Sequence, residues 1–169
     1  FASLTLSRLL YNCHTWSPVS TKVVQEWQNH IRKPLGLLAR GHTLGVSPLE
    51  LDVPTLCGLL HVLPPEDLLH MARLRYLSRL LRTCPAILWQ MLLDNETEQH
   101  SWLQACATSL GWFRRFYSDH FAVPSTNDVR QWIPLISSDA HWKGRIKAAG
   151  QACKRFRQAE AEAVAWQKR

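Results

Sequence analysis

Apolar residues recur at intervals of three and four along most of this chain. The clearest stretches are 65–83, 97–117 and 142–163. This spacing places apolar side chains on one face of an α-helix. The sequence has no alternating run of five or more residues and no Asn-Gly or Asp-Gly hairpin turn. We therefore predict an all-α fold, an irregular bundle of about seven or eight helices with no substantial sheet.

Prolines and capping residues suggest where the helices begin and end. Pro34 falls inside the second expected helix, which it should kink or split. A short helix ending near Val62 has two competing starts, Ser47 followed by Pro48, or Asp52. The expected helices are residues 2–14, 20–39, the short helix that ends near Val62, 65–83, 85–93, 97–119, 127–137 and 139–169.

Large side chains on the apolar faces give a candidate core. The chain has eight tryptophans, and each can bury a large area. Replacing a buried Phe113 or Trp89 by alanine should cost about 3–5 kcal/mol. The predicted core residues are Leu69, Leu77, Trp89, Leu103, Leu110, Phe113 and Trp132.

The composition is that of a globular protein, with 169 residues of which 46% are hydrophobic and 20% charged. This excludes a wholly disordered chain and a collagen. No apolar run approaches the length of a membrane span, so none is expected. We expect residues 1–45 to be the helical tail of an upstream domain, 46–138 a helical bundle, and 139–169 a basic amphipathic C-terminal helix.

The five cysteines are widely spaced, lie among apolar neighbours and form no Cys-x-x-Cys pair. This layout favours a reducing, intracellular compartment, nuclear or cytoplasmic. Phe1-Ala2-Ser3 at the start has no feature of a signal peptide. We expect the chain to be a piece of a longer protein.

Positive charge is concentrated at one end of the sequence. The formal net charge is +7 and the pI about 9.5, which favours polyanionic partners. Residues 1–62 have a net charge of +2, residues 63–138 of zero, and residues 139–169 of +5. The last helix is therefore the main candidate for contact with nucleic acid.

That helix combines an apolar stripe with basic residues. We expect Trp142 and Ile146 to anchor it, and the part beyond Glu160 to fray. Its lysines share a flank and could follow phosphates without reading bases. A solvated terminal helix, a membrane-surface helix and a partner helix are the alternatives. The stripe is Trp142, Ile146, Ala149, Cys153, Phe156 and Ala163, and the lysines are Lys143, Lys147 and Lys154.

The 65–83 helix carries a second basic cluster. Arg75, Arg79 and Arg82 fall within about 60° of one another on a helical wheel, on a polar face. Arg73 lies on the apolar side, where a guanidinium is more often paired within the protein than used for a ligand. The candidate nucleic-acid-binding residues are Arg75, Arg79, Arg82, Lys143, Arg145, Lys147, Lys154, Arg155 and Arg157.

Motifs for catalysis and metal binding are missing from the sequence. It contains no His-Glu-x-x-His, no phosphate-binding glycine loop, no Gly-x-Ser-x-Gly and no adjacent Asp pair. Cys57 and His61 have helical spacing, but a third ligand is not near them in sequence, which favours packing over a metal site. We expect no catalytic residue, no metal and no cofactor in this chain.

Several segments follow one another in a recognisable order. Residues 1–16 end in Cys-His-Thr-Trp, residues 73–77 are Arg-Leu-Arg-Tyr-Leu, and residues 85–89 are Pro-Ala-Ile-Leu-Trp. Together with Trp102, Trp112 and the pair Trp142-Lys143, they resemble the region that follows the polymerase core of non-LTR (LINE-type) retrotransposon reverse transcriptases. The resemblance covers most of the chain.

The resemblance implies a thumb-like helical region of an RNA-directed DNA polymerase. Such a region would contact an RNA or DNA backbone, or dock on the upstream polymerase domain of the same parent chain, with no membrane partner. The family's aromatic-x-Asp-Asp motif and Cys/His knuckle are missing from this sequence, so polymerase activity is not carried over to it. The alternative function is an α-helical protein-interaction module with Trp-rich grooves.

Overall fold

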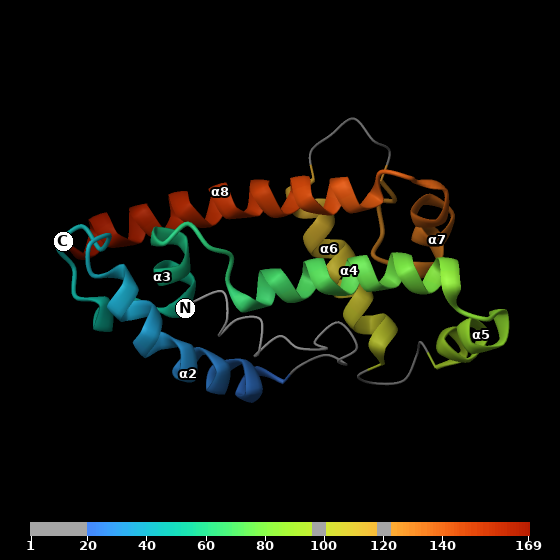
Figure 1. Ribbon diagram of the computed structural model, residues 1–169, viewed down its shortest axis with the longest axis horizontal. Helices are drawn as coiled ribbons and strands as arrows, with labels where there is room; N and C mark the ends of the chain where they lie inside the picture. The colour runs from blue at the N-terminus through green and yellow to red at the C-terminus, as the bar shows by residue number, and fades with distance from the viewer. Residues whose placement is uncertain (1–19, 96–100, 118–122) are drawn as a thin grey trace. The chain divides into compact units, whose positions relative to one another are not determined.

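A computed structural model describes residues 20–95, 101–117 and 123–169. These residues form seven α-helices and one 3₁₀ helix and contain no strand, which confirms the all-α prediction (Figure 1). The helix predicted over 2–14 lies outside the described residues. The elements are α2 (Thr21–Ala39), η2 (Pro48–Glu50), α3 (Val53–Leu59), α4 (Pro65–Thr83), α5 (Ala86–Asp94), α6 (Trp102–Phe116), α7 (Val129–Ser138) and α8 (Trp142–Lys168).

Side-chain caps fix several of the helix starts. The Oγ atom of Ser20 accepts from the Val23 amide at the start of α2. The competing starts at Ser47 and Asp52 are both used, because Ser47 caps η2 and Asp52 caps α3. Pro34 does not split its helix, since α2 is a single helix from Thr21 to Ala39, and the alternative that Pro34 kinks it stays a prediction.

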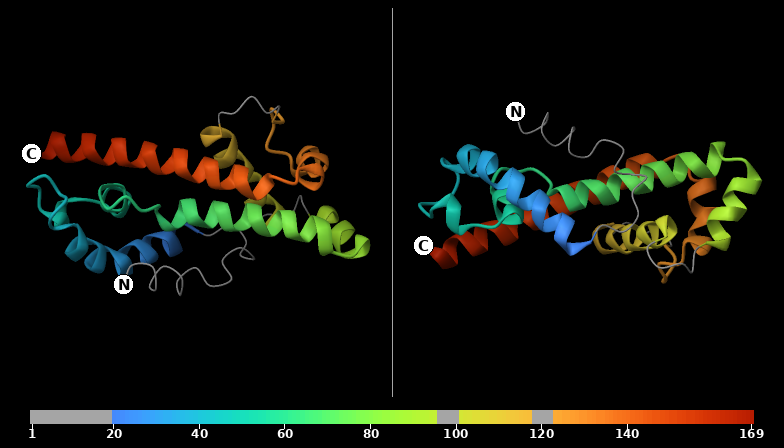
Figure 2. Two further views of the ribbon diagram at one scale, coloured as in Figure 1. Left: turned by 45° about the horizontal axis from the view of Figure 1, so that its top comes forward. Right: turned by 90° about the horizontal axis from the view of Figure 1, so that it is seen from below.

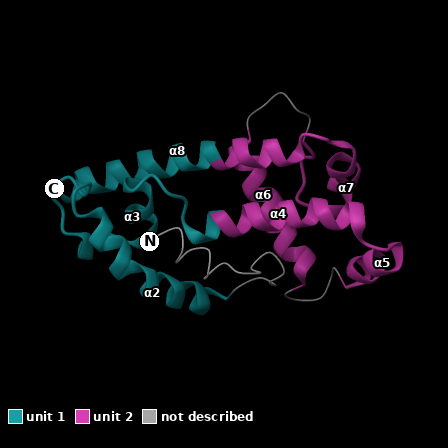
Figure 3. Cartoon of the chain, in the orientation of Figure 1, with its two compact units in different colours: residues 1–11, 19–67, 151–169 teal, residues 12–18, 68–150 magenta. Residues whose placement is uncertain are grey.

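The described residues form two compact units (Figure 3). Unit 1 contains residues 20–67 and 151–169, and unit 2 contains residues 68–150 without the two undescribed stretches. Helix α8 is continuous in both views of Figure 2 and contributes its first turns to unit 2 and the rest to unit 1. The units therefore follow packing and divide the chain differently from the three expected segments.

Unit 1 has an aliphatic core. Helices α2 and α3 pack together, and α3 also lies directly against α8. A Cβ atom on Gly58 would be 2.5 Å from the carbonyl oxygen of Arg157 and 2.6 Å from the Cβ atom of Ala161. Glycine and alanine at this crossing therefore allow the close approach. The core includes Ile31, Leu35, Val46, Leu51, Leu56, Cys57, Ala161 and Ala165.

Unit 2 has an aromatic core around Phe113. The centroid of this ring lies 4.8 Å from those of both Tyr117 and Trp142, and 5.9 Å from that of Trp132. Both indole nitrogens have partners, because Trp132 donates to the Thr126 carbonyl at 2.8 Å and Trp142 to the Leu74 carbonyl at 3.3 Å. The polar edges of the buried indoles are thus satisfied.

Most of the predicted core is confirmed. Only Trp89 differs, being half-buried on α5, a helix without a fully buried residue. Nearly every position of α5 is apolar, so its sequence has no polar face to show which side packs. The buried members are Leu69, Leu77, Leu103, Leu110, Phe113 and Trp132.

The buried stripe of α8 departs from its predicted course after Cys153. Phe156 is 39% exposed and Ala163 is also exposed. The stripe instead advances in steps of four, which turns it about 40° around the helix at each step. Ala161 and Ala165 are buried as a result, and the helix runs to Lys168. The prediction that the part beyond Glu160 frays is therefore wrong.

Candidate nucleic-acid interface

The first group of predicted cations lies on α4 within unit 2. Arg75, Arg79 and Arg82 are all exposed, as their polar helix face predicted. Arg82 also donates to the main-chain carbonyl of Asp139, at 3.2 Å, just before α8 begins. The last turn of α4 is thereby connected to the start of α8.

Asp139 also binds the side chain of Arg145. The Arg145 Nε lies 2.6 Å from the Asp139 carboxylate, and its Nη1 donates to the Tyr117 hydroxyl at 2.7 Å. Burial alone would lower the pKa of Arg145, but the hydrogen bond to Tyr117 and the charge of Asp139 raise it. Arg145 is thus permanently charged and committed to partners inside unit 2.

Two predicted lysines accompany this junction on α8. Lys143 and Lys147 are exposed, and they are separated by one helical turn within unit 2. A separation of four residues places them about 6 Å apart along the axis, close to the phosphate spacing of one strand. Lys154 and Arg155 are also exposed, on the part of α8 that belongs to unit 1.

Arg157 has a different environment from the other predicted cations. Its Nε lies 3.0 Å from the Asp67 carboxylate, whose side chain is 2% exposed, and its Nη1 lies 3.2 Å from Glu160. Burial alone would lower the pKa of Arg157, but the hydrogen bond and charge of Asp67 raise it. Within unit 1, Arg157 therefore neutralises a buried carboxylate.

The pairing of Asp67 with Arg157 was not predicted from the sequence. One signal pointed to its pairing. Positions 149, 153, 157, 161 and 165 form a four-residue series in which every member except Arg157 is Ala or Cys. A single arginine in a series of small buried residues needs a carboxylate partner.

Three further arginines in unit 2 were left out of the predicted set, although all are exposed. Arg114 donates to the Asn127 side chain at 3.0 Å, and Arg130 donates to the Leu93 carbonyl at 3.4 Å. The Arg115 guanidinium lies 5.3 Å from the centre of the Phe116 ring. They add positive charge to unit 2, but internal contacts hold each of them.

Arg73 is buried, as its position on the apolar face of α4 required. It lies close enough to Cys106 for its charge to act on that thiol. Burial raises the pKa of Cys106, and the charge of Arg73 opposes that rise. This environment agrees with a packing role for Arg73.

Cys57 and His61 lie in different environments. Cys57 is fully buried, and burial, followed by the charges of Glu66, Asp67 and Asp52, raises its pKa to about 12. His61 is exposed and has a positive φ of 54° at the end of α3. Within the described parts of the chain, no group of three or more His, Cys, Asp or Glu residues could hold a metal ion.

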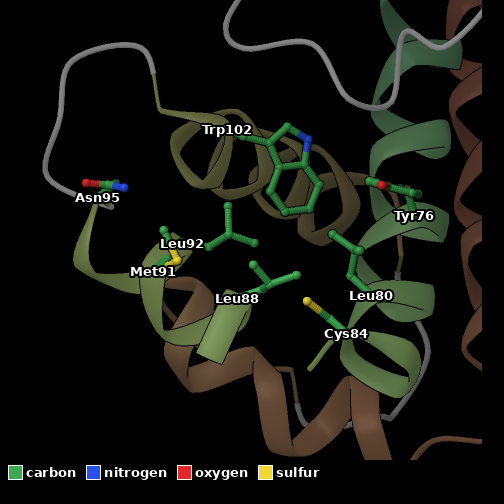
Figure 4. A pocket seen from close by; sticks show the side chains of 8 residues that line it. All are labelled: Tyr76, Leu80, Cys84, Leu88, Met91, Leu92, Asn95 and Trp102. Atoms are coloured by element: carbon green, nitrogen blue, oxygen red, sulfur yellow. The ribbon is translucent and has the colours of Figure 1, made fainter. Parts of the chain in front are cut away.

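An apolar groove in unit 2 lies between α4, α5 and α6 (Figure 4). Trp102 covers one side, Tyr76 and Leu80 project from α4, and the side chains of Leu88 and Leu92 meet them in the middle. The groove has a volume of about 480 Å³. Met91, which lines the groove, is 56% exposed, and its neighbour on α5, Ile87, is 72% exposed.

No helix in the described stretches is both long and apolar enough to cross a bilayer. A comparison of the chain with protein-family models, curated proteins and solved structures found no match.

Proposed function

We propose that unit 2 contacts the phosphate backbone of RNA or DNA without reading its sequence. The observation that carries the proposal is that Arg75, Arg79, Lys143 and Lys147 are exposed around the α4–α8 junction. The hydrogen bond from Arg82 to the Asp139 carbonyl fixes that junction. Exposed cations on rigid helices bind phosphates with little loss of conformational freedom.

The parent protein that we propose is a reverse-transcriptase-like retroelement protein. The order of the segments around 73–77, 85–89 and Trp142 supports it. In that protein the chain would be a non-catalytic region that holds nucleic acid or docks on the polymerase domain. An upstream reading frame that encodes an aromatic-x-Asp-Asp motif supports this parentage, and a frame without one contradicts it.

The binding proposal is tested with a lysine variant. Changing Lys143, Lys147 and Lys154 to glutamine should lower affinity for a mixed-sequence duplex and flatten its dependence on salt. The free energy of unfolding should stay within about 0.5 kcal/mol of the wild-type value, because all three side chains are exposed.

The matched control removes the same number of positive charges from α2 and the residue that follows it. Changing Lys22 and Lys33, which are exposed on α2, and Arg40, which is exposed directly after it, to glutamine should leave duplex affinity nearly unchanged. Equal losses in both variants would show that only net charge matters. That result would contradict a localised interface.

The groove of Figure 4 supports a second candidate function, a protein-interaction module. Its occupant would be the apolar face of a partner helix lying against Trp102 and Met91. A designed leucine-rich amphipathic peptide is the probe. If this function is correct, peptide binding should persist at high salt, since burial of apolar surface is not screened by ions. Met91→Glu should weaken the binding of the peptide.

A further inference from the structure

A second groove lies within unit 1, on the surface between α2 and η2. Its volume is about 710 Å³. Helix α2 and the 3₁₀ helix η2 approach each other closely at two residues that line the groove, since a Cβ atom on Gly36 would lie 3.4 Å from the Cβ atom of Pro48. The groove shares no described lining residue with the groove of Figure 4.

Positive charge borders this groove on its α2 side. Arg32, Lys33 and Arg40 all contribute to the lining, and the described lining residues include no carboxylate. Arg32 donates from Nη2 to the Leu49 carbonyl, which holds its guanidinium beside the groove. The Arg32 Nε is buried and has no hydrogen-bond partner among the described residues. An anionic group at this edge would therefore meet several cationic donors.

The rest of the described lining combines the apolar side chains of Leu37, Pro48 and Leu49 with Asn29, Gly36 and Ser47. Leu37 and Leu49 are 61% and 77% exposed, and Pro48 is half-buried where η2 approaches α2. Two leucines this exposed beside a hollow leave apolar surface that a ligand could cover. The groove thus combines an apolar surface with a cationic edge.

The shape and chemistry favour one class of ligand. Nucleobases bind on aromatic side chains, and the described lining contains none. A protein binds a bilayer surface through a protruding apolar face, whereas this site is concave. Aliphatic side chains of a peptide fit the hollow, and carboxylates on the same peptide fit the cations.

We infer that the α2–η2 groove binds an acidic peptide segment. Aliphatic side chains of the peptide lie against Leu37 and Leu49, and its carboxylates pair with Lys33 and Arg40. This site is independent of the nucleic-acid contact proposed for unit 2.

The test measures fluorescence anisotropy of a labelled short peptide that alternates leucine with aspartate. Changing Lys33 and Arg40 to glutamate should weaken binding about tenfold, because two attractions become repulsions. The matched control, Lys143→Glu with Lys147→Glu, should leave peptide affinity unchanged. Leu37→Ser should also weaken binding, whereas Val23→Ser, on the same helix outside the groove, should not.

Other outcomes would overturn the inference. A peptide with asparagine in place of aspartate, or serine in place of leucine, must bind more weakly than the parent peptide. If a mixed-sequence duplex or phosphatidylserine vesicles bind through Lys33 and Arg40 more tightly than the peptide does, the ligand class is wrong. Thermal unfolding of each variant, measured in parallel, identifies any loss that comes from misfolding.

Discussion

The two units of this chain use similar helices but hold them together differently. Unit 1 packs aliphatic side chains and small residues, and Gly58 lets α3 lie directly on α8. Unit 2 packs indole and phenyl rings around Phe113. Each unit also contains a shielded carboxylate that binds an arginine of α8, Asp67 with Arg157 in unit 1 and Asp139 with Arg145 in unit 2.

This comparison separates cations that look alike in the sequence. Arg157 and Arg145 stabilise the units from inside, whereas Lys143, Lys147 and Arg155 are exposed on the same helix. The basic residues of α8 therefore do not form one uniform surface. Charge that is already paired contributes little to a ligand, because binding would have to break the internal pair.

The largest effect is expected in the aromatic core of unit 2. Phe113→Ala should lower the free energy of unfolding by about 3–5 kcal/mol, because its fully buried ring contacts three others. Urea denaturation measures the loss. A cost below about 1 kcal/mol would mean that the rings do not hold unit 2 together.

The next effect distinguishes paired from exposed arginines. Arg157→Gln should lower the free energy of unfolding by about 2–3 kcal/mol, since it leaves the buried Asp67 carboxylate without its charged donor. The neighbouring Arg155→Gln should change it by less than about 0.5 kcal/mol, because Arg155 is exposed. Equal changes in the free energy of unfolding for the two variants would contradict the distinction between paired and exposed arginines.

A pair of glycine variants compares the packing of the two units. Gly58→Ala should destabilise unit 1 by about 1–3 kcal/mol, because the added methyl group meets the main chain of α8. Gly144→Ala, in the part of α8 that belongs to unit 2, should stabilise by about 0.5–1 kcal/mol, since nothing lies within 4 Å of its Cβ position. The midpoint of thermal unfolding should move in opposite directions in the two variants. Shifts of the same sign would contradict the close approach of α3 and α8 in unit 1.

A further effect on stability should appear only in alkaline solution. The pKa of Cys57 is about 12 in the folded protein, raised from 9.0 mainly by burial. A thiol exposed by unfolding loses its proton earlier, so stability should fall as pH rises from about 9 towards 12. Cys57→Ala should reduce that fall, as urea denaturation across this pH range would show. At pH 8, thiol alkylation should reach the half-buried Cys84 before Cys57.

The helices were predictable because their signals are local. Ser47 and Asp52 act as caps where the sequence places them, and α4 begins and ends at the predicted residues. Pro34 did not split α2, because the rest of that helix packs its apolar face on α3. Local propensity sets the element, and tertiary packing overrides a single unfavourable residue.

The environment of the candidate site was less predictable because it depends on residues far apart in sequence. Arg157 and Asp67 are separated by 90 positions, and no local pattern joins them. Periodicity correctly placed Arg75, Arg79 and Arg82 on an exposed face. It could not show that Arg145 is held by Tyr117, or that Arg32, Lys33 and Arg40 border a groove.

The salt dependence of duplex binding tests the central claim most directly. A variant in which Arg75, Arg79, Lys143 and Lys147 are changed to glutamine is compared with wild type. The quantity compared is the slope of log affinity against log salt concentration. Neutralising each phosphate contributes about 0.9 to this slope, so we expect it to fall by about 3–4 units while the unfolding midpoint stays constant. An unchanged slope in the folded variant would contradict the proposal that these exposed cations contact nucleic acid.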